Sequence, residues 1–188
     1  MQKSETELIQ EVLSGNPHAY RDLIERHQAR AYAMARRLIA QPEVAEDLVQ
    51  DALVKGYQQL KSFRGEASFG TWLCRIVTTT CLAYLRKEKR KPEHRSIDQY
   101  QGPAEAPEGE SRLLKGERQQ MILKTLARLS PKERLVLQMF YLDEMSIEEI
   151  CESTGFSTSN VKVLLHRGRK NFQTHYSPAN FEFHRHES

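Results

Sequence analysis

The sequence predicts an all-α protein of two small helical domains joined by a flexible acidic linker, the second containing a helix-turn-helix. Three observations support this fold class. Apolar residues recur at helical spacing on both sides of a stretch rich in proline, glycine and acidic residues. Glycine and proline cluster instead of recurring every ~8–12 residues, as they would in an all-β chain. Serine followed three residues later by glutamate, a pattern typical of helix starts, recurs in the second half.

The composition excludes several classes of protein. The chain has 188 residues, with 28 Lys and Arg against 25 Asp and Glu, so its net charge is +3 when histidine is neutral. No apolar run approaches the ~18 residues of a membrane span, and the N-terminus lacks the apolar segment of a secretory signal. The three cysteines, Cys74, Cys81 and Cys151, form no CxxC pair and cannot all pair with one another. We therefore expect a protein of the reducing cytoplasm.

The first domain is expected over residues 1–91. A short helix over residues 6–13 precedes three longer ones. Pro17 follows an asparagine that can cap the second helix, and its fixed φ suits the first helical position. Pro42 begins the third helix in the same way, and Ser68 can cap the fourth after a short loop.

The helical pattern ends at Pro92, and we expect a flexible linker over residues 92–112. Its first 20 residues contain three Pro, two Gly and five acidic residues against one Arg. Fully extended, those residues could reach about 65 Å. Helical periodicity resumes in the second domain, residues 113–174, and residues 175–188 are expected to form a loose tail.

The sharpest motif is a predicted helix-turn-helix from Ser146 to Leu165. Ile150 and its neighbours give a short helix one buried side, Gly155 supplies the turn, and Val161 anchors the second helix inward. Such a motif presents one helix to the major groove of DNA. An ordinary helical hairpin with a solvated basic face is the alternative, but the stretch that follows the turn, residues 157–172, has four Lys and Arg and no acidic residue. The exposed face is expected to carry Ser157, Ser159, Asn160, Lys162, Val163, His166, Arg167 and Lys170.

A basic and aromatic segment precedes the linker. Basic side chains bind a phosphate backbone and aromatic rings stack on unpaired bases, so the combination suits single-stranded or opening DNA. Core packing of the aromatic residues and a solvated basic helix end are the alternative interpretations. The basic residues are Arg86, Lys87, Lys89, Arg90, Lys91 and Arg95, and the aromatic ones are Phe63, Phe69, Trp72 and Tyr84.

An acidic face is predicted on the third helix of the first domain. Negative charge is the wrong sign for DNA and suits a basic protein surface, with a small apolar anchor beside it. A solvated helix face is the alternative interpretation. The acidic residues are Glu43, Glu46, Asp47 and Asp51, next to Leu48 and Val49.

In this order, the three features resemble the extracytoplasmic-function (ECF) sigma factors of bacterial RNA polymerase. The match covers residues 20–91 and 113–172. Residues 44–57 resemble the region of that family that binds core polymerase, residues 63–91 its −10 recognition and melting region, and residues 126–172 its −35-binding domain.

The resemblance implies a non-enzymatic factor, without cofactor, metal or small-molecule substrate, that directs core RNA polymerase to specific promoters and assists DNA melting. Its implied partners are core polymerase, duplex DNA at −35, a melted strand at −10, and an anti-sigma factor that controls it. The residues implied for core binding are Asp47, Leu48, Gln50 and Asp51. Those implied for −10 DNA are Phe63, Arg64, Ser68, Phe69, Trp72, Thr79, Ala83, Arg86, Lys87 and Arg90. For binding to −35 DNA, the resemblance implies the exposed residues listed above for the second helix of the helix-turn-helix.

Three positions depart from the family pattern. Thr79 stands where members usually have Asn, and Ala83 where Asp is common. Val163 replaces a hydroxyl residue and offers an apolar contact to a thymine methyl group. The promoter sequences of relatives therefore do not transfer to this chain.

Other functions remain open at this stage. A stand-alone helix-turn-helix regulator would need a dimer interface to bind paired half-sites, and no clear dimerisation element is present. A metal-dependent hydrolase could use His175, His184 and His186, but the HExxH motif is absent. Metal or redox sensing by this tail or by Cys74 and Cys81 is a third possibility, although buried small side chains are the commoner role of such cysteines.

Overall fold

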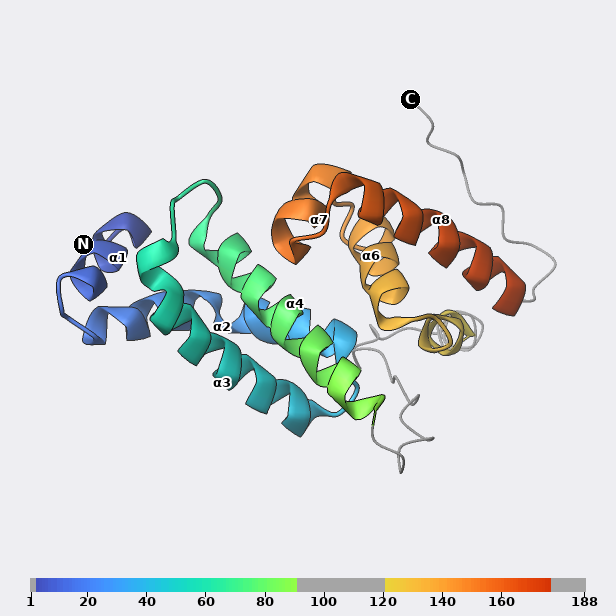
Figure 1. The fold of residues 1–188 in the computed structure, drawn as a ribbon, viewed down its shortest axis with the longest axis horizontal. Helices are drawn as coiled ribbons and strands as arrows, with labels where there is room; N and C mark the ends of the chain where they lie inside the picture. Colours follow the sequence, from blue (N-terminus) through green and yellow to red (C-terminus); the bar gives the residue numbers. More distant parts are fainter. Residues whose placement is uncertain (1–2, 91–120, 177–188) are drawn as a thin grey trace, which may run out of the picture.

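A computed structural model describes residues 3–90 and 121–176, and every regular element within these ranges is helical (Figure 1). This confirms the all-α fold class. The predicted linker and residues 177–188 of the predicted tail lie outside the described residues. The first group of helices comprises α1 (Glu5–Leu13), α2 (His18–Leu38), α3 (Pro42–Gln59), the 3-10 turn η1 (Leu60–Ser62) and α4 (Phe69–Glu88). The second comprises a helical stretch over residues 121–127, α6 (Pro131–Tyr141), α7 (Ile147–Thr154) and α8 (Thr158–His175).

Helices α2, α3 and α4 pack against one another, and α1 covers the first part of α2 (Figure 1). The predicted starts of α3 at Pro42 and of α4 after Ser68 are confirmed, and the Ser68 hydroxyl accepts a hydrogen bond from the backbone N–H of Thr71 at 3.2 Å. Helix α2 begins at His18, one residue later than predicted, because Pro17 occupies the flanking position. The side chain of Asn16 still accepts a hydrogen bond from the His18 N–H at 3.2 Å. Within residues 3–90 and 121–176, every helix is too short or too polar to span a bilayer.

A close contact between α2 and α3 depends on a glycine. The Tyr20 hydroxyl donates a hydrogen bond to the backbone carbonyl of Leu53 at 2.8 Å. A Cβ atom at Gly56 would lie 2.8 Å from that hydroxyl oxygen, so only glycine leaves room for it. Burial raises the pKa of Tyr20 to about 12, which keeps the phenol protonated and able to donate.

The second group begins its helices as predicted. Ser130 with Glu133, and Ser146 with Glu149, form the two capping boxes. Hydrogen bonds from the backbone N–H and hydroxyl of Ser146 hold the pKa of Glu149 below its ordinary value. Gly155 ends α7 with φ 74°, the left-handed conformation predicted for the turn.

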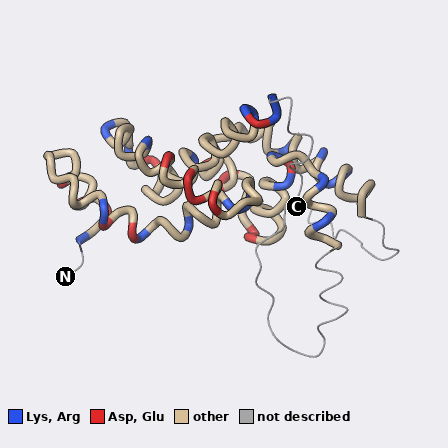
Figure 2. Tube along the Cα trace, turned by 90° about the horizontal axis from the view of Figure 1, so that it is seen from below, with Lys and Arg blue, Asp and Glu red and all other residues tan. Residues whose placement is uncertain are grey.

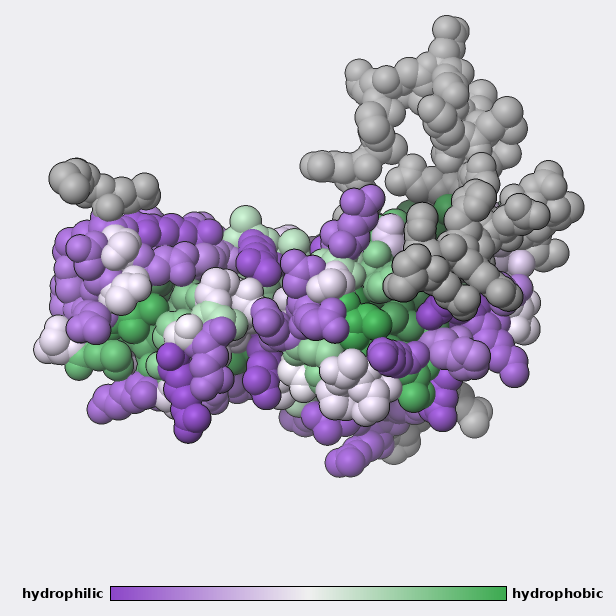
Figure 3. All heavy atoms as spheres, turned by 90° about the horizontal axis from the view of Figure 1, so that it is seen from above, coloured by the Kyte–Doolittle hydropathy of each residue, from purple (hydrophilic) through white to green (hydrophobic). Residues whose placement is uncertain are grey.

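The two groups of helices are in contact. Helix α4 packs against α7, and α2 packs against α6. The view from above shows the groups meeting along one continuous body (Figure 3). The sequence predicts two domains and indicates nothing about a contact between them.

We predict that Gly56→Ala destabilises the first group by about 1–3 kcal/mol, because the added methyl group displaces the Tyr20 hydroxyl from Leu53. Chemical denaturation of the purified variant measures this change in the free energy of unfolding. Tyr20→Phe removes the obstructing oxygen and should itself cost about 1 kcal/mol. The double variant should therefore be less destabilised than the sum of the two single variants. Simple additivity would refute the proposed contact.

Candidate nucleic-acid interface

The helix-turn-helix predicted from the sequence is present in α7 and α8. Ser157 caps α8 by accepting a hydrogen bond from the Asn160 N–H at 3.3 Å. Val161, Leu164 and Leu165 are buried, which turns the opposite side of α8 to solvent. That solvent side carries the side chains expected to contact duplex DNA, all exposed except Asn160, which is half-buried: Ser157, Ser159, Asn160, Lys162, Val163, His166, Arg167 and Lys170.

Val163 is an unusual member of this exposed face. Its apolar side chain is 45% exposed, whereas the next two residues of α8, Leu164 and Leu165, are buried. An exposed apolar group among basic ones can contact the methyl group of thymine in the major groove. The face therefore combines hydrogen-bond donors, positive charge and one apolar contact point.

A second basic surface lies on the solvent side of α4 and the loop before it. Seven of the residues implied for −10 DNA are exposed on this surface: Arg64, Ser68, Thr79, Ala83, Arg86, Lys87 and Arg90. The Arg86 side chain is partly held along the helix, because its Nε donates to the Leu82 carbonyl at 3.2 Å. Lys91 and Arg95 lie outside the described residues.

The aromatic residues near this surface have different environments. Phe69 is only 1% exposed, and its ring packs against those of Tyr20, His27, Phe63 and Trp72 at centroid distances of 5.4–6.4 Å. Phe69 is thus a core residue, and its side chain has no surface on which a base could stack. Phe63 and Trp72 are half-buried with ring centroids 5.3 Å apart, so part of each side chain stays accessible at the start of α4.

The acidic face of α3 is solvent-exposed. Glu43, Glu46, Asp47 and Asp51 are exposed, and acidic positions gather near the middle of the trace when the protein is seen from below (Figure 2). Gln50 is exposed beside them, whereas Leu48 is only 7% exposed and belongs to the core. Leu48 therefore supports this face from beneath.

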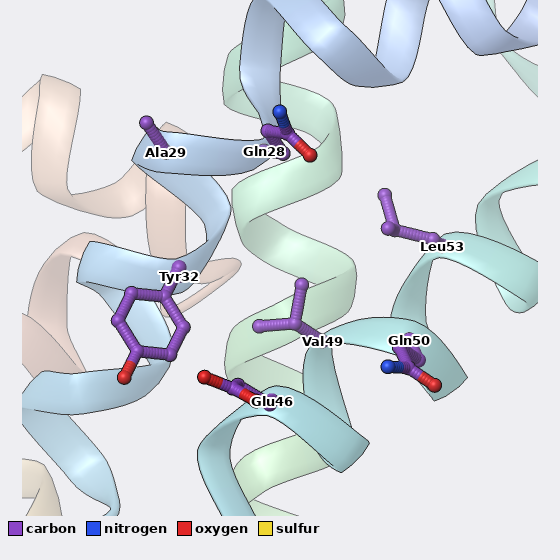
Figure 4. Close-up of a pocket in the computed structure, with 7 residues that line it drawn as sticks. All are labelled: Gln28, Ala29, Tyr32, Glu46, Val49, Gln50 and Leu53. Carbon is purple, nitrogen blue, oxygen red and sulfur yellow. The ribbon is translucent and has the colours of Figure 1, made fainter. Parts of the chain in front are cut away.

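A groove of about 430 Å³ lies between α2 and α3 next to the acidic face (Figure 4). The contribution of α2 is not evident from the sequence, because its three lining residues share no pattern and come together only when the two helices are packed. Tyr32, which belongs to the apolar pattern of α2 and is half-buried, was the one available signal. The groove is lined by Gln28, Ala29 and Tyr32 of α2 and by Glu46, Val49, Gln50 and Leu53 of α3.

The described residues give little support to metal or redox chemistry. Within residues 3–90 and 121–176, no group of His, Cys, Asp and Glu is arranged to hold a metal ion. Burial raises the pKa of the Cys74 thiol, and that of Cys81 to about 12, so the reactive thiolate is disfavoured at both positions. His184 and His186 lie outside the described residues.

Comparisons with known proteins agree on one family. Residues 23–91 match the family model of sigma-70 region 2, and residues 119–172 match that of sigma-70 region 4. The ECF RNA polymerase sigma-E factor of Escherichia coli is 28% identical over 179 residues, covering 91% of this chain and 93% of its own. The ECF RNA polymerase sigma factor SigW of Bacillus subtilis is 28% identical over 172 residues, covering 86% and 91%.

A solved structure shares the fold. The sigma factor RpoE of Bartonella quintana, in complex with the anti-sigma factor NepR, is 24% identical, with a TM-score of 0.60 over 83% of this chain and 95% of that one.

Proposed function

This chain belongs to the extracytoplasmic-function group of the sigma-70 family, and from that membership we propose how its surfaces direct core RNA polymerase to promoters. Members of the family are transcription initiation factors without catalytic activity, and we assign the same character to this chain. The observation that carries the proposal is the separation of three exposed surfaces: a basic face on α8, a basic face on α4 and an acidic face on α3.

Helix α8 binds the duplex −35 element in the major groove. Ser157 and Ser159 at its N-terminal end are small enough to approach phosphates and base edges. Arg167 can donate two hydrogen bonds to one guanine, and Val163 can contact a thymine methyl group. Because this combination differs from the pattern common in relatives, the −35 sequence is expected to be its own.

The loop before α4 and the exposed side of α4 bind the −10 element. The half-buried rings of Phe63 and Trp72 offer a place where a base that leaves the stack can be held, and the basic residues at the end of α4 hold the strand. The energy gained by holding the separated bases offsets the cost of unpairing them. Phe69 acts from the core by fixing the position of both rings.

The acidic face of α3 and the adjoining groove dock on a basic surface of core polymerase. Asp47, Gln50 and Asp51 supply exposed charge and hydrogen-bonding groups, while the half-buried Tyr32 and Leu53 supply apolar area in the groove. Charge complementarity accelerates association and selects the partner, and the apolar contact slows dissociation.

Binding to polymerase joins two weak DNA-binding surfaces into one tight one. When both DNA-binding faces are held on one polymerase molecule, binding of the first face to DNA raises the effective concentration of the second face near its own element. Because one solved relative is bound to an anti-sigma factor, we extend such control to this chain. We place the protein in the cytoplasm, because bacterial core polymerase works there.

We predict that Arg167→Ala weakens binding to the preferred −35 sequence by about 1–3 kcal/mol and relaxes selectivity at one base pair. The measurement is transcription by the reconstituted holoenzyme from promoters that carry each base change in turn. Arg167→Lys keeps the charge but cannot form the paired hydrogen bonds, so it should also lose selectivity. Unchanged selectivity in both variants would contradict the role of Arg167.

We predict that Asp51→Arg weakens binding to purified core polymerase at least tenfold while leaving the helical fold intact, because it reverses the charge of an exposed residue of the docking face. Fluorescence titration of labelled protein with core polymerase measures the affinity. Asp22→Arg makes the same change of charge at an exposed position of α2 outside the groove. Equal losses in the two variants would indicate a general effect of net charge and refute docking through this face.

A further inference from the structure

The ring of His27 in α2 connects three helices of the first group. Its Nε2 lies 2.8 Å from the Oε1 of Glu5 in α1, and its ring packs against that of Phe69 in α4 with the centroids 5.4 Å apart. The side chain of His27 is 14% exposed and that of Glu5 is 38% exposed, so the hydrogen bond is partly shielded from water. His27 thus contacts a residue of each of the two other helices.

Gly70 makes room for the His27 ring at the start of α4. A Cβ atom at Gly70 would lie 2.7 Å from the Nδ1 of His27 and 3.1 Å from its Cε1, closer than a side chain can approach. The ring therefore lies close against the backbone of α4. Because Phe69 precedes Gly70, His27 contacts two successive residues of α4, one through its aromatic ring and the other through its backbone.

The hydrogen bond to Glu5 fixes the direction in which the His27 ring faces. A carboxylate only accepts hydrogen bonds, so Nε2 carries the hydrogen and donates it to Glu5. With Nε2 directed at α1, the Nδ1 and Cε1 atoms face Gly70. Loss of the acceptor would leave a largely buried donor without its partner and the ring free to turn.

Helix α1 holds Glu5 in place and contacts the chain on both sides of the loop over residues 63–68, here called the −10 loop. The helix is fixed by the buried side chains of Leu8 and Val12, and Ser4 caps it by accepting a hydrogen bond from the Glu7 N–H at 3.2 Å. It packs on η1, the turn that precedes the −10 loop (Figure 1). Through Glu5 and His27 it is also connected to the first residues of α4, which follow that loop.

We propose that Glu5 and His27 are positioning residues for the −10 loop, so that α1 takes part in promoter opening through the core. The inference rests on the function proposed above, which assigns the unstacked base to Phe63 and Trp72. Both rings pack on Phe69, at centroid distances of 6.1 and 5.6 Å. A close-packed core passes the displacement of one ring on to its neighbours. A turn of the His27 ring therefore changes the place where the base is held.

Substitutions at Glu5 test the hydrogen bond without altering the core. Glu5→Ala removes the acceptor, whereas Glu5→Gln keeps an amide oxygen that can still accept from Nε2. Glu25→Ala removes the same charge from an exposed position of α2 and is the matched control. We expect Glu5→Ala to reduce promoter melting by the holoenzyme about three- to tenfold. The other two variants should match the wild type.

Two measurements report on the −10 loop. Trp72 is the only tryptophan of the chain, so the fluorescence of the free full-length protein reports on one of the two rings. Glu5→Ala should shift its emission and increase its quenching by acrylamide, while circular dichroism shows that the helices are retained. In the holoenzyme, permanganate oxidation of unpaired thymines measures melting of a promoter fragment identified by run-off transcription. Binding of a duplex −35 fragment should not change, which separates positioning from a general loss of stability.

A double-mutant cycle tests the contact between His27 and Gly70. Gly70→Ala forces the ring aside and should shift the emission of Trp72. His27→Ala removes the ring, so the added methyl group finds room. The double variant should therefore show a smaller change than the sum of the two single variants. Additive changes would refute the contact.

The results separate this inference from the proposed function. Unchanged Trp72 emission and unchanged melting in a folded Glu5→Ala variant would overturn the positioning role. Glu5→Gln that is as impaired as Glu5→Ala would also overturn it, because the hydrogen bond would then have no part in the effect. Emission that changes in Glu5→Ala and returns in Glu5→Gln would support the connection from α1 to the −10 loop even if no protein, wild type included, melted DNA. Such a lack of melting would overturn the proposed function alone.

Discussion

The burial of one side of α4 is the constraint on which the rest of the structure depends. Leu73, Cys74, Val77 and Cys81 are almost completely buried against α2 and α3, so α4 has only one orientation in the first group. That orientation leaves Thr79, Ala83 and Arg86 facing outward on a rigid helix. A site on a rigid element holds its geometry more closely than a site on a loop. The same packing brings α2 and α3 together and creates the groove beside the acidic face of α3.

The aromatic cluster at the start of α4 links this core to the loop that precedes it. Phe69 fills the core, while Phe63 and Trp72 rest on it with part of each ring exposed. Edge and tilted contacts of this kind favour defined ring positions. The loop to which we assign the unstacked base is thus fixed by aromatic packing beneath it. In the second group, the capping boxes and the left-handed Gly155 hold α7 and α8 at the angle that exposes the basic face.

Local patterns predicted the helices and the helix-turn-helix well, because caps, prolines and apolar spacing act within a few residues of each other. The capping boxes at Ser130 and Ser146 and the turn at Gly155 are confirmed. The sequence could not show which aromatic and apolar residues near the sites are buried and which are exposed. A helix that carries apolar residues on more than one side has several plausible buried sides. Phe69 and Leu48 were expected at interfaces, yet both are buried. The groove depends on residues far apart in sequence, and so does the ion pair between Arg37 of α2 and Asp143 of the α6–α7 turn. No local pattern indicates either of them.

The central claim is that this chain gives promoter specificity to bacterial RNA polymerase. Run-off transcription tests it most directly, using purified bacterial core polymerase with and without the protein on fragmented genomic DNA from its source. The account predicts discrete transcripts that appear only with the protein, whose start sites share two upstream elements at the spacing of −35 and −10. Absence of both transcripts and binding to core polymerase would contradict it.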